Sequence, residues 1–119
     1  MKNFIIGRVK SIKYAVKGMY ILATTEHSII SQLFIGSLIT IAGFYYNLSA
    51  TEWAIQCICI GLIVTAEGLN TAIEAICDYL QPNFDPKIGY IKDIAAGAVS
   101  FAALFSVIVA IIIYYPKIF

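Results

Sequence analysis

The segment AEGLNTAIEAICDY, residues 66–79, places three carboxylates on one side of a strongly apolar helix. With Glu67 taken as zero, a rotation of about 100° per residue puts Glu74 at about −20°, Asp78 at about 20° and Asn70 at about −60°. A charged side chain in hydrocarbon costs roughly 2.5 kcal/mol or more, so acids in such a helix usually face a protein interior and mark a pathway or reaction site. The segment therefore predicts both a long helix and the place of function.

The composition is that of an integral membrane protein. Hydrophobic residues make up 61% of the 119 residues and charged residues 13%, whereas soluble domains average roughly 25% charged residues. Residues 27–51 and 94–116 carry no formal charge, and each stretch exceeds the roughly 20 residues needed to cross a membrane. The uncharged stretch 53–66 is shorter, so its helix must continue through the acids. We expect a single membrane-embedded domain over residues 1–119.

The expected fold class is an all-α membrane protein, with an N-terminal amphipathic surface helix over about residues 4–25. Three transmembrane helices should follow, over about residues 28–47, 52–80 and 91–115. The first segment has the pattern of a helix lying in the headgroup plane, because apolar side chains gather on one face and lysines on the other. They are Ile5, Val9, Ile12, Val16 and Met19 against Lys10, Lys13 and Lys17.

The distribution of basic residues predicts the topology. Five of them precede the first span, at Lys2, Arg8, Lys10, Lys13 and Lys17. Lys87 and Lys92 lie between the second and third spans, and the turn at 47–52 has no basic residue. The positive-inside rule therefore places the N-terminus and the 81–92 loop in the cytoplasm. Tyr114 and its aromatic neighbours near the outer ends of the spans are expected to anchor the chain at the membrane interface.

The position of each acid along the second span predicts its depth in the membrane. Measured from Trp53 at about 1.5 Å per residue, Glu67 lies roughly 21 Å along the helix, Glu74 roughly 31 Å and Asp78 roughly 37 Å. Since the hydrocarbon is about 30 Å thick, the acids run from acyl-chain depth into the cytoplasm. At that boundary the hydroxyl of a membrane lipid can meet a soluble nucleotide.

The helix ends on either side of the 81–92 loop favour opposite charges. The second span ends there, and its negative dipole end adds to the carboxylates in favouring a cation. The third span begins there, and its positive end together with Lys92 suits phosphate oxygens. Carboxylates beside a phosphate site indicate Mg²⁺, which is commonly held by one or two carboxylates plus substrate phosphates. The pattern favours phosphoryl transfer.

At these residues the chain resembles the small bacterial diacylglycerol kinase and undecaprenol kinase family of integral membrane lipid kinases. The resemblance is carried by AEGLNTAIEAICDY at 66–79, KDIAAGAV at 92–99, YAVKG at 14–18 and Glu26. It implies an ATP-dependent lipid kinase that works as a homotrimer in the bacterial cytoplasmic (inner) membrane, in lipid recycling or in phospholipid and cell-envelope metabolism. No nucleic-acid partner is expected.

The resemblance also implies roles for single residues. Glu67 would be the general base and also touch the lipid substrate, with Ala96 in the same substrate site. Asn70 would be the second catalytic residue. Mg²⁺ would be held by Glu26 and Glu74. The nucleotide contacts would be Arg8, Tyr14, Asp78, Lys92 and Asp93. The chain departs from the family pattern at Ile30, where related chains often have a basic residue.

Two other functions stay open at the level of sequence. A small proton-coupled membrane exporter could also use a membrane glutamate, although it would need one acid near the midplane rather than a stripe that leads to the cytoplasm. A non-catalytic membrane subunit would need no acids. Between the two lipid alcohols, the motifs NTAIEA and KDIAAGAV favour undecaprenol over diacylglycerol.

Overall fold

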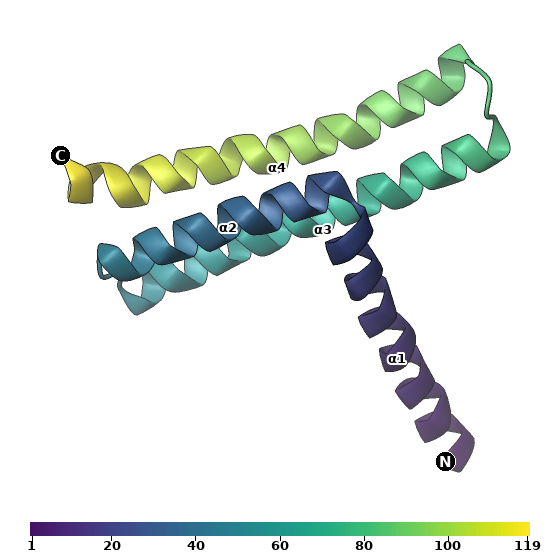
Figure 1. Cartoon of the computed structure of the whole chain (residues 1–119), viewed down its shortest axis with the longest axis horizontal. Coiled ribbons are helices and arrows are strands. Elements are labelled where there is room, and N and C mark those ends of the chain that lie inside the picture. The colour runs from purple at the N-terminus through teal and green to yellow at the C-terminus, as the bar shows by residue number, and fades with distance from the viewer.

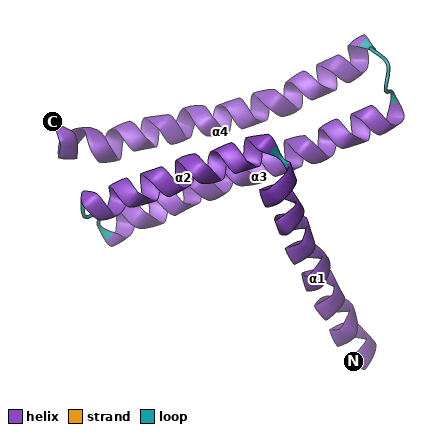
Figure 2. Ribbon diagram, in the orientation of Figure 1, coloured by secondary structure: helices purple, strands orange, loops and turns teal.

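The computed structural model describes all residues, 1–119, and consists of four α-helices joined by short connections (Figures 1 and 2). The helices are α1 (Lys2–Thr25), α2 (His27–Tyr45), α3 (Ala50–Leu80) and α4 (Pro86–Ile118). The last three are long and apolar enough to cross a membrane. The predicted all-α membrane fold with three long apolar helices is therefore confirmed.

The helix α3 is the centre of the arrangement. It forms a long antiparallel hairpin with α4, and α2 lies along its N-terminal half (Figure 1). The helix α1 leaves this three-helix bundle at a steep angle, from a point near the middle of α3 (Figure 1). We call the two ends of the bundle the turn end, where α2 connects to α3, and the loop end, where α3 connects to α4.

The turn end is fixed by local hydrogen bonds that the sequence encodes. The chain leaves α2 through Asn47, which has a φ of 53°. The side chain of Ser49 then accepts a hydrogen bond from the backbone N–H of Glu52 at 3.2 Å, and Glu52 Oε1 accepts one from the N–H of Ser49 at 2.9 Å. This reciprocal capping box starts a helix. As a result α3 begins at Ala50, slightly before the predicted span 52–80.

At the loop end, a second helix cap begins α4. Asp85 Oδ1 accepts hydrogen bonds from the backbone N–H groups of Lys87, at 2.8 Å, and Ile88, at 3.3 Å. Pro86 occupies the first helical position, where its fixed φ and missing N–H cost nothing. The helix α4 therefore starts five residues before the predicted span 91–115, and it continues past Pro116 to Ile118.

Close packing at the turn end depends on a glycine. A Cβ atom at Gly43 would lie only 2.6 Å from the ring of Trp53, so α2 and α3 approach too closely for any side chain there. Beside this contact, Leu48, Ile113 and Tyr114 form a small buried cluster that joins α4 to the α2–α3 turn.

A buried polar network ties all three spans together at the same end. The hydroxyl of Tyr114 donates to Gln56 Oε1 at 2.5 Å, and Gln56 Nε2 donates to the carbonyl oxygen of Ile39 at 3.5 Å. Gln56 is 5% exposed and Tyr114 is 9% exposed. The expectation that Tyr114 is an interfacial anchor is therefore wrong, because its hydroxyl has a partner inside the bundle.

Replacing Tyr114 by Phe tests this network. The variant leaves Gln56 Oε1 without its donor, and hydrogen bonds between membrane helices contribute roughly 0.6–2 kcal/mol. We expect Tyr114→Phe to lower the free energy of unfolding by about 1 kcal/mol, measured by denaturant titration of the purified protein in micelles. Tyr115→Phe is the matched control, since that side chain is 61% exposed. Equal stability of the two variants would contradict the role of the network.

Candidate functional site

The polar residues of the C-terminal half of α3 form one stripe, which we call the acid stripe: Glu67, Asn70, Glu74 and Asp78. All four belong to the same unbroken helix. Exposure rises along the stripe, from half-buried Glu67 and Asn70 to exposed Glu74 and Asp78. The stripe therefore leads from the side of the bundle to the open loop end, as the sequence pattern predicts.

Asn70 is the most constrained member of the stripe. Its Nδ2 donates to Glu74 Oε1 at 3.2 Å, one helical turn further on. Its Oδ1 is buried and accepts no hydrogen bond. Buried oxygen acceptors normally have a partner, so this atom has capacity for a donor or a cation supplied by a ligand. The Asn70–Glu74 pair thus presents oxygen atoms of two residues next to each other.

The loop end is held by an ion pair between α3 and α4. Lys92 Nζ lies 2.5 Å from Asp78 Oδ1, and the side chains are 36% and 65% exposed, respectively. Two residues that the sequence assigns to nucleotide binding are therefore in direct contact. Asp93 follows on α4 and is exposed, as is Ala96 one turn later, whose carbonyl accepts from Ser100 Oγ at 3.1 Å.

Glu26 lies at the junction of α1 and α2. The residue is half-buried and extended, with φ −95° and ψ 113°, so α1 ends and α2 begins on either side of it. One turn earlier, Leu22 of α1 approaches α3 so closely that a Cβ atom at Gly68 would lie 3.2 Å from Leu22 Cδ1. The glycine that follows Glu67 thereby lets the junction that carries Glu26 sit against this part of α3.

Arg8 and Tyr14 lie on α1, whose N-terminal half extends away from the bundle (Figure 1). The guanidinium of Arg8 lies 5.3 Å from the centre of the Phe4 ring, and Tyr14 is 67% exposed. The structure thus brings Lys92 to Asp78 and Asn70 to Glu74, but it shows no contact of Arg8 or Tyr14 with the stripe. Their assignment to the nucleotide stays a prediction.

The donor atoms of the stripe suit a hard cation. Carboxylate and amide oxygens from Glu74 and Asn70 are the ligand types that Mg²⁺ prefers, and the unpartnered Oδ1 of Asn70 adds one acceptor. No three His, Cys, Asp or Glu side chains come together as a complete metal cage. A Mg²⁺ site here would be shared with substrate phosphates, which is the usual way this ion is bound at phosphoryl-transfer sites.

The fold and the stripe define a multi-pass helical membrane protein with an oxygen-rich site at one end of its bundle. Residues 13–114 match the model of the prokaryotic diacylglycerol kinase family, and the chain belongs to that family. It is therefore a lipid kinase, and the family resemblance seen in the acid stripe and in residues 92–99 is confirmed.

Two relatives show how far the similarity extends. The chain is 36% identical over 108 residues to the undecaprenol kinase of Bacillus subtilis (strain 168), covering 91% of this chain and 88% of that protein. It is 32% identical over 100 residues to a diacylglycerol kinase of Synechocystis sp., covering 83% of this chain and 57% of that protein.

A substitution at Lys92 separates its predicted role in nucleotide binding from its contribution to the stability of the protein. Solvent-exposed ion pairs contribute little to stability, so we expect Lys92→Gln to leave the free energy of unfolding nearly unchanged. The predicted charge-assisted contact of Lys92 with phosphate would be lost in this variant, so the KM for ATP should rise about tenfold. Lys87→Gln, an exposed lysine five residues earlier, is the control. A large loss of stability with unchanged KM would assign Lys92 to structure instead.

Proposed function

We propose that this lipid kinase transfers the γ-phosphoryl group of ATP directly to the primary hydroxyl of a membrane lipid alcohol, in a Mg²⁺-dependent reaction. The observation that carries the proposal is the acid stripe. It runs along one face of α3 from half-buried Glu67 to the exposed Asp78–Lys92 pair. A lipid hydroxyl and a soluble triphosphate can approach such a stripe from opposite ends.

Glu67 is the general base of this proposal. Its carboxylate takes the proton of the lipid hydroxyl while the hydroxyl oxygen forms a bond to the γ-phosphorus. The bond from that phosphorus to the β–γ bridging oxygen breaks, and ADP leaves with the bonding electrons. The proton on Glu67 then passes to water. No phosphoenzyme is needed, because phosphoryl transfer depends mostly on positioning and on electrostatic stabilisation.

Residues at the loop end hold the nucleotide. Lys92 contacts the phosphates, and Asp78 orients the Lys92 ammonium through their ion pair. Asp93 borders the same site on α4, and Ala96, one turn further along α4, offers a small side chain beside the lipid substrate. Arg8 and Tyr14 complete the nucleotide contacts from α1.

The Mg²⁺ ligands in this proposal are Glu74 and Glu26. Asn70 Nδ2 donates a hydrogen bond to the carboxylate of Glu74 at 3.2 Å and so orients it. Asn70 Oδ1 has no partner and is free to accept a hydrogen bond or to coordinate a cation. When bound, Mg²⁺ neutralises charge on the β- and γ-phosphate oxygens. Asn70 thus acts as the second catalytic residue by holding the stripe in a reactive arrangement.

The membrane setting follows from the same proposal. The N-terminus and residues 81–92 lie on the cytoplasmic side of the bacterial inner membrane, where ATP is available. The helix α1 contains no buried residue, which fits a helix that rests on the membrane surface. The active assembly is a homotrimer, in which neighbouring copies complete the walls of each site.

Undecaprenol is the proposed first substrate, and diacylglycerol the second candidate. The support is the match to the undecaprenol kinase of Bacillus subtilis, which extends over 88% of that protein, whereas the match to the diacylglycerol kinase covers 57%.

Radiolabelled ATP tests the reaction directly. Purified protein in mixed micelles, given Mg²⁺ and undecaprenol, should transfer label from the γ-position to a lipid phosphate, and chelation of Mg²⁺ should abolish the transfer. Absence of labelled lipid together with substrate-driven proton release would instead support an exporter.

Two substitutions test the assigned roles. Glu67→Gln and Glu74→Gln should each lower turnover about 100-fold or more, through loss of the base and of a metal ligand respectively. Excess Mg²⁺ should partly restore Glu74→Gln and leave Glu67→Gln unchanged. Glu52→Gln is the control, because it lies at the turn end and glutamine also completes a capping box. Near-normal turnover in Glu74→Gln would remove it as a metal ligand.

A further inference from the structure

The helix α1 carries most of the positive charge of the chain. Residues 1–25 contain five basic side chains and no acidic one. All five are exposed, and the two ion pairs of the structure, Lys92 with Asp78 and Lys117 with Glu52, involve none of them. The charge on α1 therefore has no partner within its own chain.

The four lysines of α1 lie along one side of the helix, which we call the lysine flank. With Ile5 taken as zero, a rotation of about 100° per residue puts Lys2, Lys13, Lys17 and Lys10 at about 60°, 80°, 120° and 140°. The four ammonium groups thus share a sector of about 80°. A sector of this width can face one charged surface with all four groups at once.

An apolar stripe runs beside the lysine flank. Its five side chains lie between about −40° and 40° on the same scale, and they are between 54% and 70% exposed. They are Ile5, Val9, Ile12, Val16 and Met19. A helix with such a stripe next to a basic flank is typical of the membrane interface, where the apolar side chains enter the acyl region and the lysines stay at the level of the phosphates.

The lysine flank points away from the acid stripe. The residue of α1 that approaches α3 is Leu22, since a Cβ atom at Gly68 would lie 3.2 Å from Leu22 Cδ1. On the scale used for the lysines, Leu22 lies at about −100°. The four lysines are therefore about 120–180° away from the side of α1 that faces α3. The carboxylates of α3 in the same chain are not their partners.

We propose that the lysine flank binds the phosphates of anionic phospholipids, so that α1 selects anionic over zwitterionic lipids in the leaflet on which it rests. The inference rests on the proposed function for the membrane setting of α1. Clusters of four or more basic residues on an amphipathic helix are typical of such binding, because they meet the negative potential of the leaflet. The exposed apolar stripe favours a lipid surface over a dissolved polyanion, which would leave these side chains in water.

Fluorescence quenching by brominated lipids tests the preference in the full chain. Tryptophan is quenched when bromine on a neighbouring acyl chain contacts it, and Ile12→Trp places a reporter in the apolar stripe. The variant is reconstituted in phosphatidylcholine vesicles with about 20% phosphatidylglycerol, and an equal fraction of the lipid is brominated on one or the other species. We expect quenching of the added tryptophan to be at least about twofold stronger with brominated phosphatidylglycerol.

The wild-type protein is both the reference and the control. Its single tryptophan, Trp53, begins α3 at the turn end, far from α1 (Figure 1). The wild-type signal is subtracted from that of Ile12→Trp, and it should be quenched equally by the two lipids. Equal quenching of the added tryptophan by the two lipids would overturn the inference.

Removal of the charges tests whether the lysines cause the preference. Lys10→Gln, Lys13→Gln and Lys17→Gln, combined with Ile12→Trp, should abolish it, and about 0.5 M NaCl should weaken it in the chain that keeps its lysines, because salt screens exposed charges. Lys87→Gln is the matched control, since this exposed lysine lies on α4. A preference that survives the triple substitution would exclude the lysine flank as the binding site.

The kinase assay separates this inference from the proposed function. Preferential quenching by the anionic lipid, in a protein that phosphorylates no lipid alcohol in any vesicle, would remove the proposed function and leave the lipid preference of α1 standing. Lipid phosphorylation together with equal quenching by both lipids would have the opposite meaning. A triple variant that loses its oligomeric state, measured by crosslinking in the vesicles, would assign the lysines to a second copy and overturn the inference.

Discussion

The continuity of α3 is the constraint on which the structure depends. The helix has 31 residues and is therefore about 46 Å long, well beyond the roughly 30 Å of membrane hydrocarbon. One rigid rod thus carries both the apolar residues that face α2 and α4 and the carboxylates of the acid stripe, and the helical period holds them in line. A break or a kink within Ile63–Glu74 would rotate the acids out of line with the turn-end half of α3.

Polar contacts hold the two ends of this rod and leave its middle open. At the turn end, Tyr114 and Gln56 satisfy each other inside the bundle, and Lys117 pairs with Glu52 at 3.3 Å. At the loop end, Lys92 pairs with Asp78. Unsatisfied polar groups are costly in a membrane, so the buried Tyr114–Gln56 pair favours this register of α4 against α3, and both ion pairs are compatible with it. Between them the α3 face is apolar on one side of Glu67 and acidic on the other, which suits a substrate that is itself part lipid and part alcohol.

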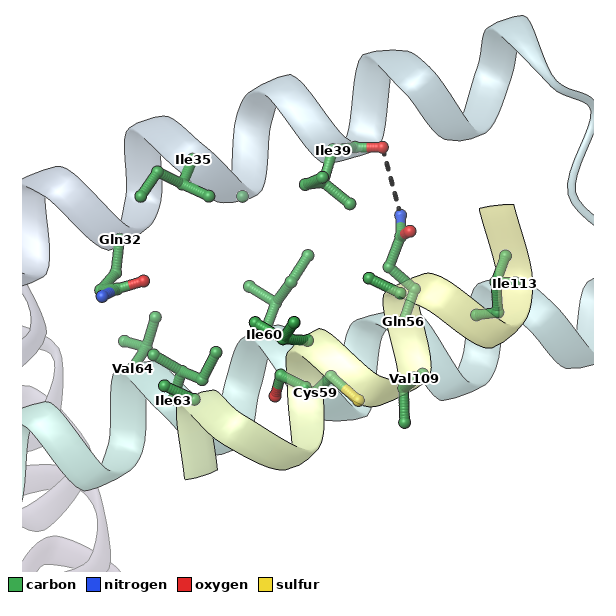
Figure 3. A pocket seen from close by; sticks show the side chains of 15 residues that line it. Gln32, Ile35, Ile39, Gln56, Cys59, Ile60, Ile63, Val64, Val109 and Ile113 are labelled. Atoms are coloured by element: carbon green, nitrogen blue, oxygen red, sulfur yellow. Dashed lines mark hydrogen bonds between the residues drawn. The ribbon is translucent and has the colours of Figure 1, made fainter. Parts of the chain in front are cut away.

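The sequence predicts what depends on helical period, and it misses what depends on the distance between helices. The order of residues along the acid stripe and the three apolar spans follow from spacing, whereas the ion pair between Lys92 and Asp78 is seen only in the structure. The apolar pocket between the three spans (Figure 3), which Ile35 and Ser106 help to line, does not follow from the sequence, because it exists only where α2 and α4 diverge over α3 and nothing in the spacing of these residues encodes that separation. The burial of Tyr114 was missed for the same reason, since its partner Gln56 lies 58 residues away. Asp85 followed by Pro86 is a helix cap followed by a first helical residue, so the start of α4 at Pro86 could have been predicted from these two residues.

The junction between α1 and α2 adds a second requirement on the same face of α3. Gly68 lets Leu22 approach the helix backbone, and Glu26 follows one turn later at the only break between these two helices. A Cβ atom at position 68 would lie 3.2 Å from Leu22 Cδ1, so the Leu22 side chain would have to shift by a few tenths of an ångström. A glycine directly after the proposed base thus lets Leu22, in the last turn of α1, lie close to the part of α3 that carries Glu67. This contact places the C-terminal end of α1 near the C-terminal half of α3, whereas the N-terminal half of α1 extends away from the bundle (Figure 1).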